Sequence, residues 1–151
     1  MSKAKVLFIC VHNSARSRMA EGFLNAHCGD FFEAQSAGLE RASNVNPLAA
    51  EVMQEIGIDI SQKAGQEVFE VWRSGPVFAY VITVCHESEA GGCPVFPGPA
   101  KRLHWPFPDP SKVQGTHSEK LAQVREIRDM IRAQVQEWCA DVCGLTTGPS
   151  A

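Results

Sequence analysis

The sequence lacks long apolar runs and an excess of positive charge. No apolar stretch approaches the ~20 residues that cross a bilayer. The run at residues 6–11 is too short for a signal peptide, and no cleavage site of small residues closely follows it. Fourteen Lys and Arg against seventeen Asp and Glu give a net charge of −3, whereas general nucleic-acid binders are normally basic. We therefore expect a cytoplasmic protein that binds neither a membrane nor nucleic acid.

Internal repeats, linkers and long charge runs are absent too, which excludes a repeat protein. The 151 residues are 44% apolar and 21% charged, close to the average of folded soluble proteins, and this excludes a disordered chain. A chain of this length buries about two thirds of the surface that its unfolded form exposes. We predict a single domain over residues 1–143, a small, polar and flexible tail over residues 144–151, and a monomer.

Short apolar runs alternate with helical patterns along the chain. The patterns predict strands at residues 5–10, 31–37 and 77–84, a short fourth strand at Trp105, and helices at 17–27, 46–57, 66–72 and from 116 onward. Asn46-Pro47 has the form of a helix cap, and Thr116 and Glu119 have the spacing of a capping box. This alternation predicts an α/β fold, a three-layer sandwich with a four-stranded parallel sheet flanked by helices.

Residues 86–110 look different, because Gly91, Gly92, Gly98 and six prolines make them a long irregular stretch. A loop of this length in a compact domain is usually functional or mobile. In parallel sheets, ligands bind beyond the carboxyl ends of the strands. Cys10 and Cys85 end the first and third predicted strands, so two thiols converge on that edge.

Cysteine is plentiful: the chain has six, at positions 10, 28, 85, 93, 139 and 143. In a reducing compartment, cysteines are more often buried apolar groups, metal ligands or reactive thiols than structural bridges. We expect Cys28 and Cys139 to be packed small residues. Cys139 and Cys143, one helical turn apart, can bind a metal or oxidise, but no His lies nearby in the sequence. A zinc site at Cys85, His86 and Cys93 has wide spacing, and we expect no metal.

The loop after the first strand carries the clearest chemistry. It reads Cys10-Val11-His12-Asn13-Ser14-Ala15-Arg16-Ser17 and leads into a helix. Backbone N–H groups and the helix dipole at such a junction favour an anion, and they acidify a thiol there. Arg16 adds a planar, permanently charged fork for two oxygens of a tetrahedral anion, while Ser14 and Ser17 can donate hydrogen bonds. The residues predict a Cys10 thiolate nucleophile beside an oxyanion site made by residues 11–17.

The motif Cys-x5-Arg-Ser at position 10 resembles the low-molecular-weight protein tyrosine phosphatase superfamily. Ser36-Ala37-Gly38, Asn46-Pro47 and Asp109-Pro110 stand in the order and similar spacing of that superfamily's marks. The resemblance covers roughly residues 4–138 and implies the low-molecular-weight phosphatase fold. It also implies that Cys10 is the nucleophile, that Arg16 clamps the oxyanion and that Asp109 is the general acid.

Features outside the loop separate two branches of this superfamily. Ser111 and Lys112 follow Asp109-Pro110 where the phosphatases usually carry aromatic residues, and Ala15 stands where their loop usually has a second Cys. A pocket without an aromatic clamp suits a small free anion. Thr83-Val84-Cys85, Cys93-Pro94 and His104-Trp105 resemble the thioredoxin-coupled arsenate reductases, which share this fold.

This second resemblance implies a relay of thiols. Cys10 attacks arsenate and expels hydroxide. Cys85 then attacks Cys10, which releases arsenite and leaves a Cys10–Cys85 disulfide, and Cys93 moves the bridge to Cys85–Cys93. Thioredoxin reduces that bridge, with glutaredoxin as the alternative, because residues 12–15 also resemble a loop of relatives that use glutathione or another small thiol. The relay implies no cofactor besides this external thiol reductant, and phosphate and sulfate would compete for the loop.

The relay requires the cysteines that exchange disulfides to come within bonding distance of one another. Bridged cysteines need Cα atoms within ~7 Å, whereas alternate strands of a sheet lie ~10 Å apart. Cys85 and Cys93 then cannot both reach their partners without motion. Gly91-Gly92 supplies flexible backbone, and we expect residues 85–100 to change conformation during turnover.

Two other functions stay open. One is a phosphatase of the same fold that hydrolyses phosphomonoesters through a cysteinyl-phosphate and has no need of Cys85 or Cys93. The other is a non-catalytic protein that binds an anion or arsenite with clustered thiols. Substitution of Cys10 separates both enzymes from the binding protein, and substitution of Cys85 separates the reductase from the phosphatase.

Overall fold

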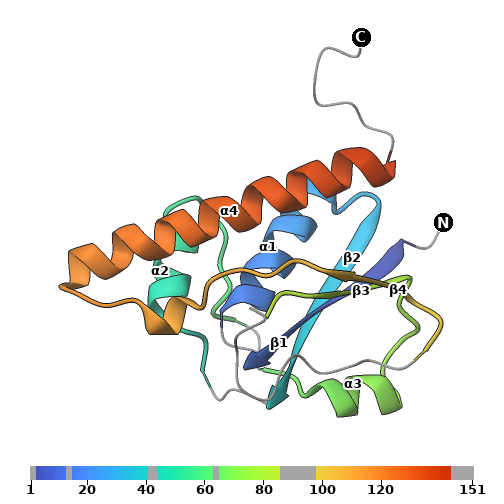
Figure 1. Cartoon of the computed structure of the whole chain (residues 1–151). Coiled ribbons are helices and arrows are strands. Elements are labelled where there is room, and N and C mark those ends of the chain that lie inside the picture. Colours follow the sequence, from blue (N-terminus) through green and yellow to red (C-terminus); the bar gives the residue numbers. More distant parts are fainter. Residues whose placement is uncertain (1–2, 13–14, 41–43, 63–64, 86–97, 144–151) are drawn as a thin grey trace, which may run out of the picture.

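The computed structural model describes residues 3–12, 15–40, 44–62, 65–85 and 98–143. Within these ranges lies a four-stranded parallel sheet in the order β2-β1-β3-β4 (Figure 1). The strands are β1 (Ala4–His12), β2 (Phe32–Glu40), β3 (Tyr80–Thr83) and β4 (Lys101–His104). The helices are α1 (Arg16–Cys28), α2 (Pro47–Gln54), α3 (Val68–Ser74), the short 3-10 helix η1 (Pro110–Lys112) and α4 (His117–Cys143).

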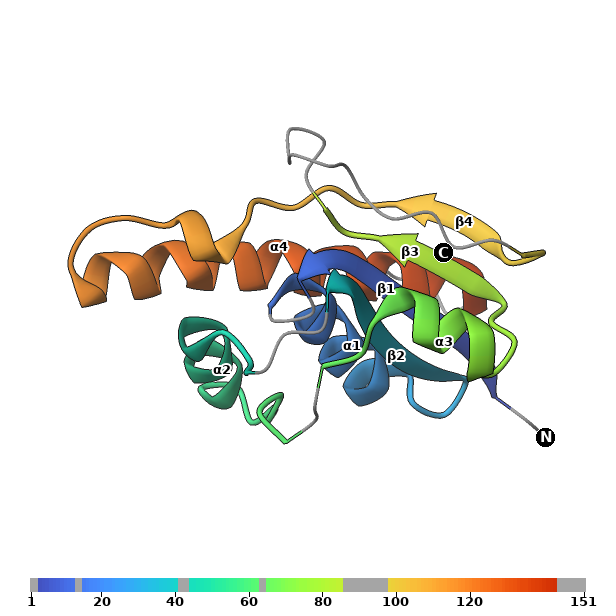
Figure 2. The ribbon, with the colours of Figure 1, turned by 90° about the horizontal axis from the view of Figure 1, so that it is seen from below.

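The sheet has a hydrophobic core on each face. Alternate residues of β1 point to opposite sides, so Val6 and Phe8 join the larger core with α1, α2 and α4, while Leu7 and Ile9 join a smaller one with α3. Figures 1 and 2 show α4 and α1 on one side of the sheet and α3 on the other. The predicted three-layer α/β architecture is therefore confirmed.

The predicted helix caps are present. Asn46 Oδ1 accepts hydrogen bonds from the backbone N–H groups of Leu48 (2.9 Å) and Ala49 (3.2 Å), and Pro47 is the first helical residue of α2. At the start of α4, Thr116 N–H donates to Glu119 Oε1 (2.9 Å), and Glu119 N–H donates to Thr116 Oγ1 (3.1 Å). Both patterns satisfy backbone donors that the first helical turn leaves unpaired.

The sheet order corrects one expectation about distances. Because β1 and β3 are direct neighbours, their backbones lie about 4.8 Å apart, not the ~10 Å of alternate strands. Cys10 and Cys85 therefore extend from adjacent strands.

The carboxyl-terminal half of the predicted irregular stretch is also more regular than expected. Residues 101–104 form β4, and this strand ends before Trp105, whose N–H donates to the Thr83 carbonyl oxygen (2.7 Å). Residues 86–97 and the tail at 144–151 lie outside the described residues, so the expectations for them are not tested here.

Aromatic packing and a disulfide attach the carboxyl-terminal part of α4 to the rest of the domain. The ring centroid of Trp138 lies 5.0 Å from the ring centroids of Phe32 and Tyr80 and 5.9 Å from that of Trp105. Cys139 forms a disulfide with Cys28 at the end of α1. The expectation of two separate packed thiols is wrong on this point: both residues are buried, but they are bonded to each other, because helix packing brings together positions that are distant in sequence.

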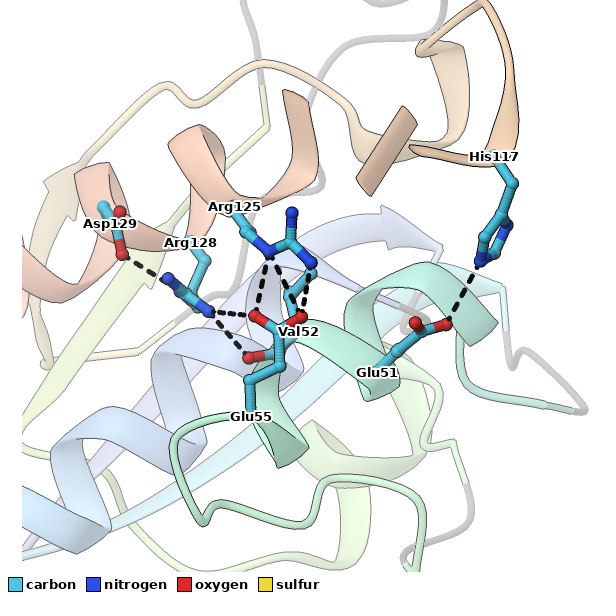
Figure 3. Close-up of polar contacts among 7 residues, drawn as sticks. All are labelled: Glu51, Val52, Glu55, His117, Arg125, Arg128 and Asp129. Carbon is cyan, nitrogen blue, oxygen red and sulfur yellow. Dashed lines mark hydrogen bonds and ion pairs between the residues drawn. The ribbon is translucent and has the colours of Figure 1, made fainter. Parts of the chain in front are cut away.

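A cluster of charges links α2 to α4 (Figure 3). Glu55 accepts hydrogen bonds from Arg125 Nε (3.0 Å) and Nη2 (2.7 Å) and from Arg128 Nη1 (3.0 Å). Arg128 Nη1 also donates to the Val52 carbonyl oxygen (2.9 Å). This Glu55–Arg125–Arg128 cluster fixes the end of α2 against the middle of α4.

None of the helices in the described ranges is both long enough and apolar enough to span a bilayer.

Candidate active site

Cys10 lies near the end of β1, in register with Gly38 of β2, and its side chain is buried (1% exposed). Its Sγ lies 2.6 Å from the His12 carbonyl oxygen and 3.0 Å from Ser17 Oγ. Ser17 is the second residue of α1 and is also buried. The strand and the following helix therefore meet at the thiol, and the Ser17 hydroxyl is placed to donate a hydrogen bond to a Cys10 thiolate.

Arg16 is the first residue of α1, and its side chain is only 4% exposed. Its Nη1 donates to the Phe107 carbonyl oxygen (3.1 Å), and its Nη2 lies 3.8 Å from Asp109 Oδ2. The guanidinium thus connects the start of α1 with the segment between β4 and η1. A cation at a helix N-terminus near a buried thiol provides the groups that bind an oxyanion.

Asp109 is held by its own turn. It is the N-cap of η1, and its Oδ1 accepts hydrogen bonds from Ser111 N–H (2.9 Å) and Ser111 Oγ (2.8 Å). Pro110, the residue directly after it, is buried. Because Oδ1 is engaged in the cap, Oδ2 is the oxygen that faces Arg16, and the carboxyl group is presented at the same edge as Cys10.

Buried charges lie behind the loop. Arg18 and Glu21 of α1 are 4% and 6% exposed. Ser36 Oγ donates to Glu21 Oε1 (2.5 Å), and Arg18 Nη1 donates to the Ile60 carbonyl oxygen (3.5 Å). Burial lowers the pKa of Arg18, while the charges of Glu21 and Cys10 act to raise it. Since a Coulombic interaction is mutual, the Arg18 cation in turn favours the Cys10 thiolate.

Sequence reasoning missed Arg18. The only signal was the pairing of opposite charges at Arg18 and Glu21, three residues apart on a predicted helix. That pattern usually marks a solvated helix face, and only the packing of residues 58–60 over α1 shows that both side chains are buried.

The second thiol adjoins the same edge. Cys85, two residues beyond β3, is fully buried, and its Sγ lies 3.8 Å from the carbonyl oxygen of Ile9, the residue before Cys10. Cys85 is disulfide-bonded, whereas Cys10 is not. His104 Nδ1 lies 2.7 Å from Thr83 Oγ1 on the neighbouring strand.

The other predicted loop residues divide into two groups. Val11 is half-buried, His12 is exposed and Ala15 is the buried N-cap position of α1. Asn13, Ser14 and Cys93 lie outside the described residues. Within the described part of the chain, no group of three His, Cys, Asp or Glu side chains is arranged to hold a metal ion.

Comparison with known proteins gives the site its family. Residues 5–144 match the family described as low molecular weight phosphotyrosine protein phosphatase. The chain belongs to this family. An arsenate reductase of Bacillus licheniformis is 40% identical over 139 residues, which make up 91% of this chain and 96% of that protein.

Solved structures support the same fold. A structure described as an arsenate reductase in the phosphate binding state superposes with a TM-score of 0.71 at 28% identity, covering 91% of this chain and 98% of that one. A thioredoxin-dependent arsenate reductase of Corynebacterium glutamicum superposes with a TM-score of 0.69 at 29% identity, covering 95% of this chain and 64% of that one. The family assignment and the fold therefore rest on nearly the whole chain.

Proposed function

We propose that this protein is an arsenate reductase that converts arsenate to arsenite through a Cys10 thiolate. The observation that carries the proposal is the position of Cys85. A second cysteine beside the end of β1, disulfide-bonded while Cys10 is not, supports redox chemistry at this edge. A phosphatase would need only the nucleophile, the arginine and the acid. The relatives that match over nearly the full length bear the same activity in their names.

The substrate is a tetrahedral oxyanion, and the site offers positive charge from two sources. The N-terminus of α1 presents backbone donors and the positive end of its dipole. Arg16 supplies two parallel N–H donors, and its present partners, the Phe107 carbonyl and Asp109, hold the guanidinium at the mouth of the loop.

The first step forms a bond between Cys10 Sγ and arsenic. Arsenic loses one oxygen as hydroxide, and a proton from Asp109 converts this leaving group to water. Ser17, 3.0 Å from Cys10 Sγ, stabilises the attacking thiolate. Arsenic remains pentavalent in this adduct.

The second step carries the reduction. The Cys85 thiolate attacks Cys10 Sγ, a Cys10–Cys85 disulfide forms, and the electron pair of the sulfur–arsenic bond stays on arsenic, which leaves as arsenite. Because β1 and β3 are neighbours, this transfer takes place between adjacent strands. Cys93 then attacks Cys85 to form the Cys85–Cys93 disulfide.

An external dithiol protein closes the cycle. Thioredoxin is the proposed partner, with glutaredoxin and a small thiol as the alternative donor, and the chain itself needs no cofactor. Reductants of this kind belong to the cytoplasm. We therefore propose that the enzyme acts in the cytoplasm, as a monomer.

The experiment is a coupled assay of NADPH oxidation with thioredoxin and thioredoxin reductase. We expect turnover that depends on arsenate, that is abolished in Cys10→Ser and Cys85→Ser, and that is retained in Cys143→Ser. If the thioredoxin system gives no turnover, the same variants are measured with glutathione and glutaredoxin. Failure with both systems would overturn the proposal.

Phosphomonoester hydrolysis is the second candidate, favoured by the arrangement of Cys10, Arg16 and Asp109 that the family shares. Hydrolysis of p-nitrophenyl phosphate tests it. A true phosphatase keeps this activity in Cys85→Ser and shows no arsenate-dependent oxidation of NADPH. A reductase loses its arsenate turnover in the same variant.

A further inference from the structure

Cys28 and Cys139 form a second pair of thiols that the relay does not use. Cys28 is the last residue of α1 and Cys139 lies one turn before the end of α4. Their Cα atoms are 6.6 Å apart, near the upper end of the ~4.4–6.8 Å range of disulfides. The spacing therefore accommodates a direct bond. An atom inserted between the two sulfurs requires them to move apart once this bond has been reduced.

The pair is separate from the catalytic edge. Cys28 and Arg16 stand at opposite ends of the 13-residue helix α1, which is about 20 Å long at 1.5 Å per residue. Direct exchange between Cys28 and Cys10 is not possible at this separation. The two thiols at the ends of α1 and α4 thus constitute an independent centre.

A cavity of about 560 Å³ adjoins the pair. Besides the two cysteines, its lining includes His27, Gln136, Glu137 and Asp141. Carboxylates repel arsenate, which is an anion, but they do not repel arsenous acid, which is uncharged at neutral pH. The carboxylates of Glu137 and Asp141 therefore disfavour the arsenate anion relative to uncharged arsenous acid, the reverse of the selection proposed at Arg16.

We propose that Cys28 and Cys139, when reduced, form a dithiol site for trivalent arsenic. The disulfide seen in the structure is the closed state of this site. A dithiol reductant reduces the Cys28–Cys139 disulfide and becomes a disulfide itself. Two electrons and two protons pass to the sulfurs of Cys28 and Cys139. Arsenous acid then loses two hydroxyl groups, which leave as water with the two thiol protons, while two sulfur–arsenic bonds form and arsenic stays trivalent.

The chemistry of the site points to arsenic rather than to a divalent metal. Soft thiolates prefer soft, thiophilic partners, and structural zinc needs four protein ligands. No cluster of three potential metal ligands occurs among the residues that the structure describes. Trivalent arsenic needs only two sulfurs, because a hydroxyl group completes its coordination.

The test measures arsenite binding directly, so it is independent of turnover, although the biological source of the ligand rests on the proposed function. The relay thiols are removed in the variant Cys10→Ser/Cys85→Ser/Cys93→Ser, which is reduced with a phosphine, freed from it and mixed with sodium arsenite. Native mass spectrometry is expected to show one arsenic atom per chain. Further substitution, Cys28→Ser or Cys139→Ser, should abolish binding, and Cys143→Ser, on the same helix, should retain it.

The absence of bound arsenic in the reduced triple variant would overturn the site. Its persistence after Cys28→Ser would do the same. Substitution of Cys28 or Cys139 could itself cause misfolding, so a second comparison leaves both residues in place. In this comparison, the oxidised triple variant should bind at least tenfold less arsenite than the reduced triple variant. Equal binding would likewise exclude the site. Arsenate turnover of the unaltered protein, measured separately, reports on the proposed function alone.

Discussion

Arg16 and Asp109 face each other at 3.8 Å, one at the first residue of α1 and the other at the cap of η1. This contact joins the oxyanion loop to the segment that carries the proposed acid. It places the proposed proton donor beside the arginine that would hold the anion. The orientation of this carboxyl group depends on the Ser111 turn.

Asp109→Asn keeps the shape of the cap but removes the proton donor. We expect the arsenate turnover number to fall by about 10²–10⁴-fold, the usual contribution of general acid catalysis, with the affinity for arsenate nearly unchanged. Steady-state kinetics checks this, and Asp129→Asn on the exposed face of α4 is the control. A variant with normal turnover would remove Asp109 from the mechanism.

Arg18→Gln should make the Cys10 thiol less acidic. The buried Arg18 cation favours the thiolate, so its loss should raise the pH midpoint of Cys10 alkylation. The rate of reaction with iodoacetamide is followed against pH in a variant whose other cysteines are serine. Arg18→Lys should restore most of the acidity, and Arg73→Gln, on α3, should have no effect. An unchanged midpoint in Arg18→Gln would contradict the electrostatic role.

Glu55→Gln should weaken the link between α2 and α4 (Figure 3). Hydrogen bonds from Arg125, together with the charges of Arg125 and Arg128, lower the pKa of Glu55 from its ordinary 4.5. A lowered carboxylate pKa means that the stabilisation is present above pH 4.5 and is lost as the pH falls through the folded-state pKa.

Because this cluster is exposed to solvent, the effect of Glu55→Gln is modest. The Tm at pH 7 is expected to drop by no more than about 2–4 °C, and the difference from the unaltered protein should shrink in high salt and at acid pH. Calorimetry at two salt concentrations checks this, with Glu70→Gln on α3 as the control. If the difference in Tm between Glu55→Gln and the unaltered protein grows as the pH falls, the predicted direction of the pH dependence is contradicted.

Removal of the Cys28–Cys139 disulfide should destabilise the fold. The bridge closes a loop of 111 residues between α1 and α4, and loss of a native bridge typically costs about 2–4 kcal/mol. Urea denaturation of Cys28→Ser is expected to show this loss of unfolding free energy. In a Cys85→Ser background, which removes the other bridge, a reducing agent should produce the same loss, and it should add nothing once Cys28→Ser is also present. If oxidised and reduced protein are equally stable, the bridge contributes nothing to the fold.

Local chemistry determined most of what could be predicted from the residues. Apolar periodicity located the strands and helices, and the Asn46-Pro47 and Thr116–Glu119 patterns located two helix starts, because a cap is satisfied within one turn of chain. The thiol, arginine and serine of the loop are likewise close in sequence, so their convergence at the start of α1 followed from a single strand–loop–helix junction.

The sequence by itself therefore determined the α/β class and pointed to the loop between β1 and α1 as the proposed nucleophilic site. Only the tertiary structure decided that β1 and β3 are neighbours, that Arg18 is buried behind Cys10, and that Cys28 is bonded to Cys139. Each of these depends on segments that meet only when the sheet order and the helix packing are complete. No periodicity or motif within one segment records such a meeting, because the free energy that fixes it comes from surfaces contributed by distant parts of the chain.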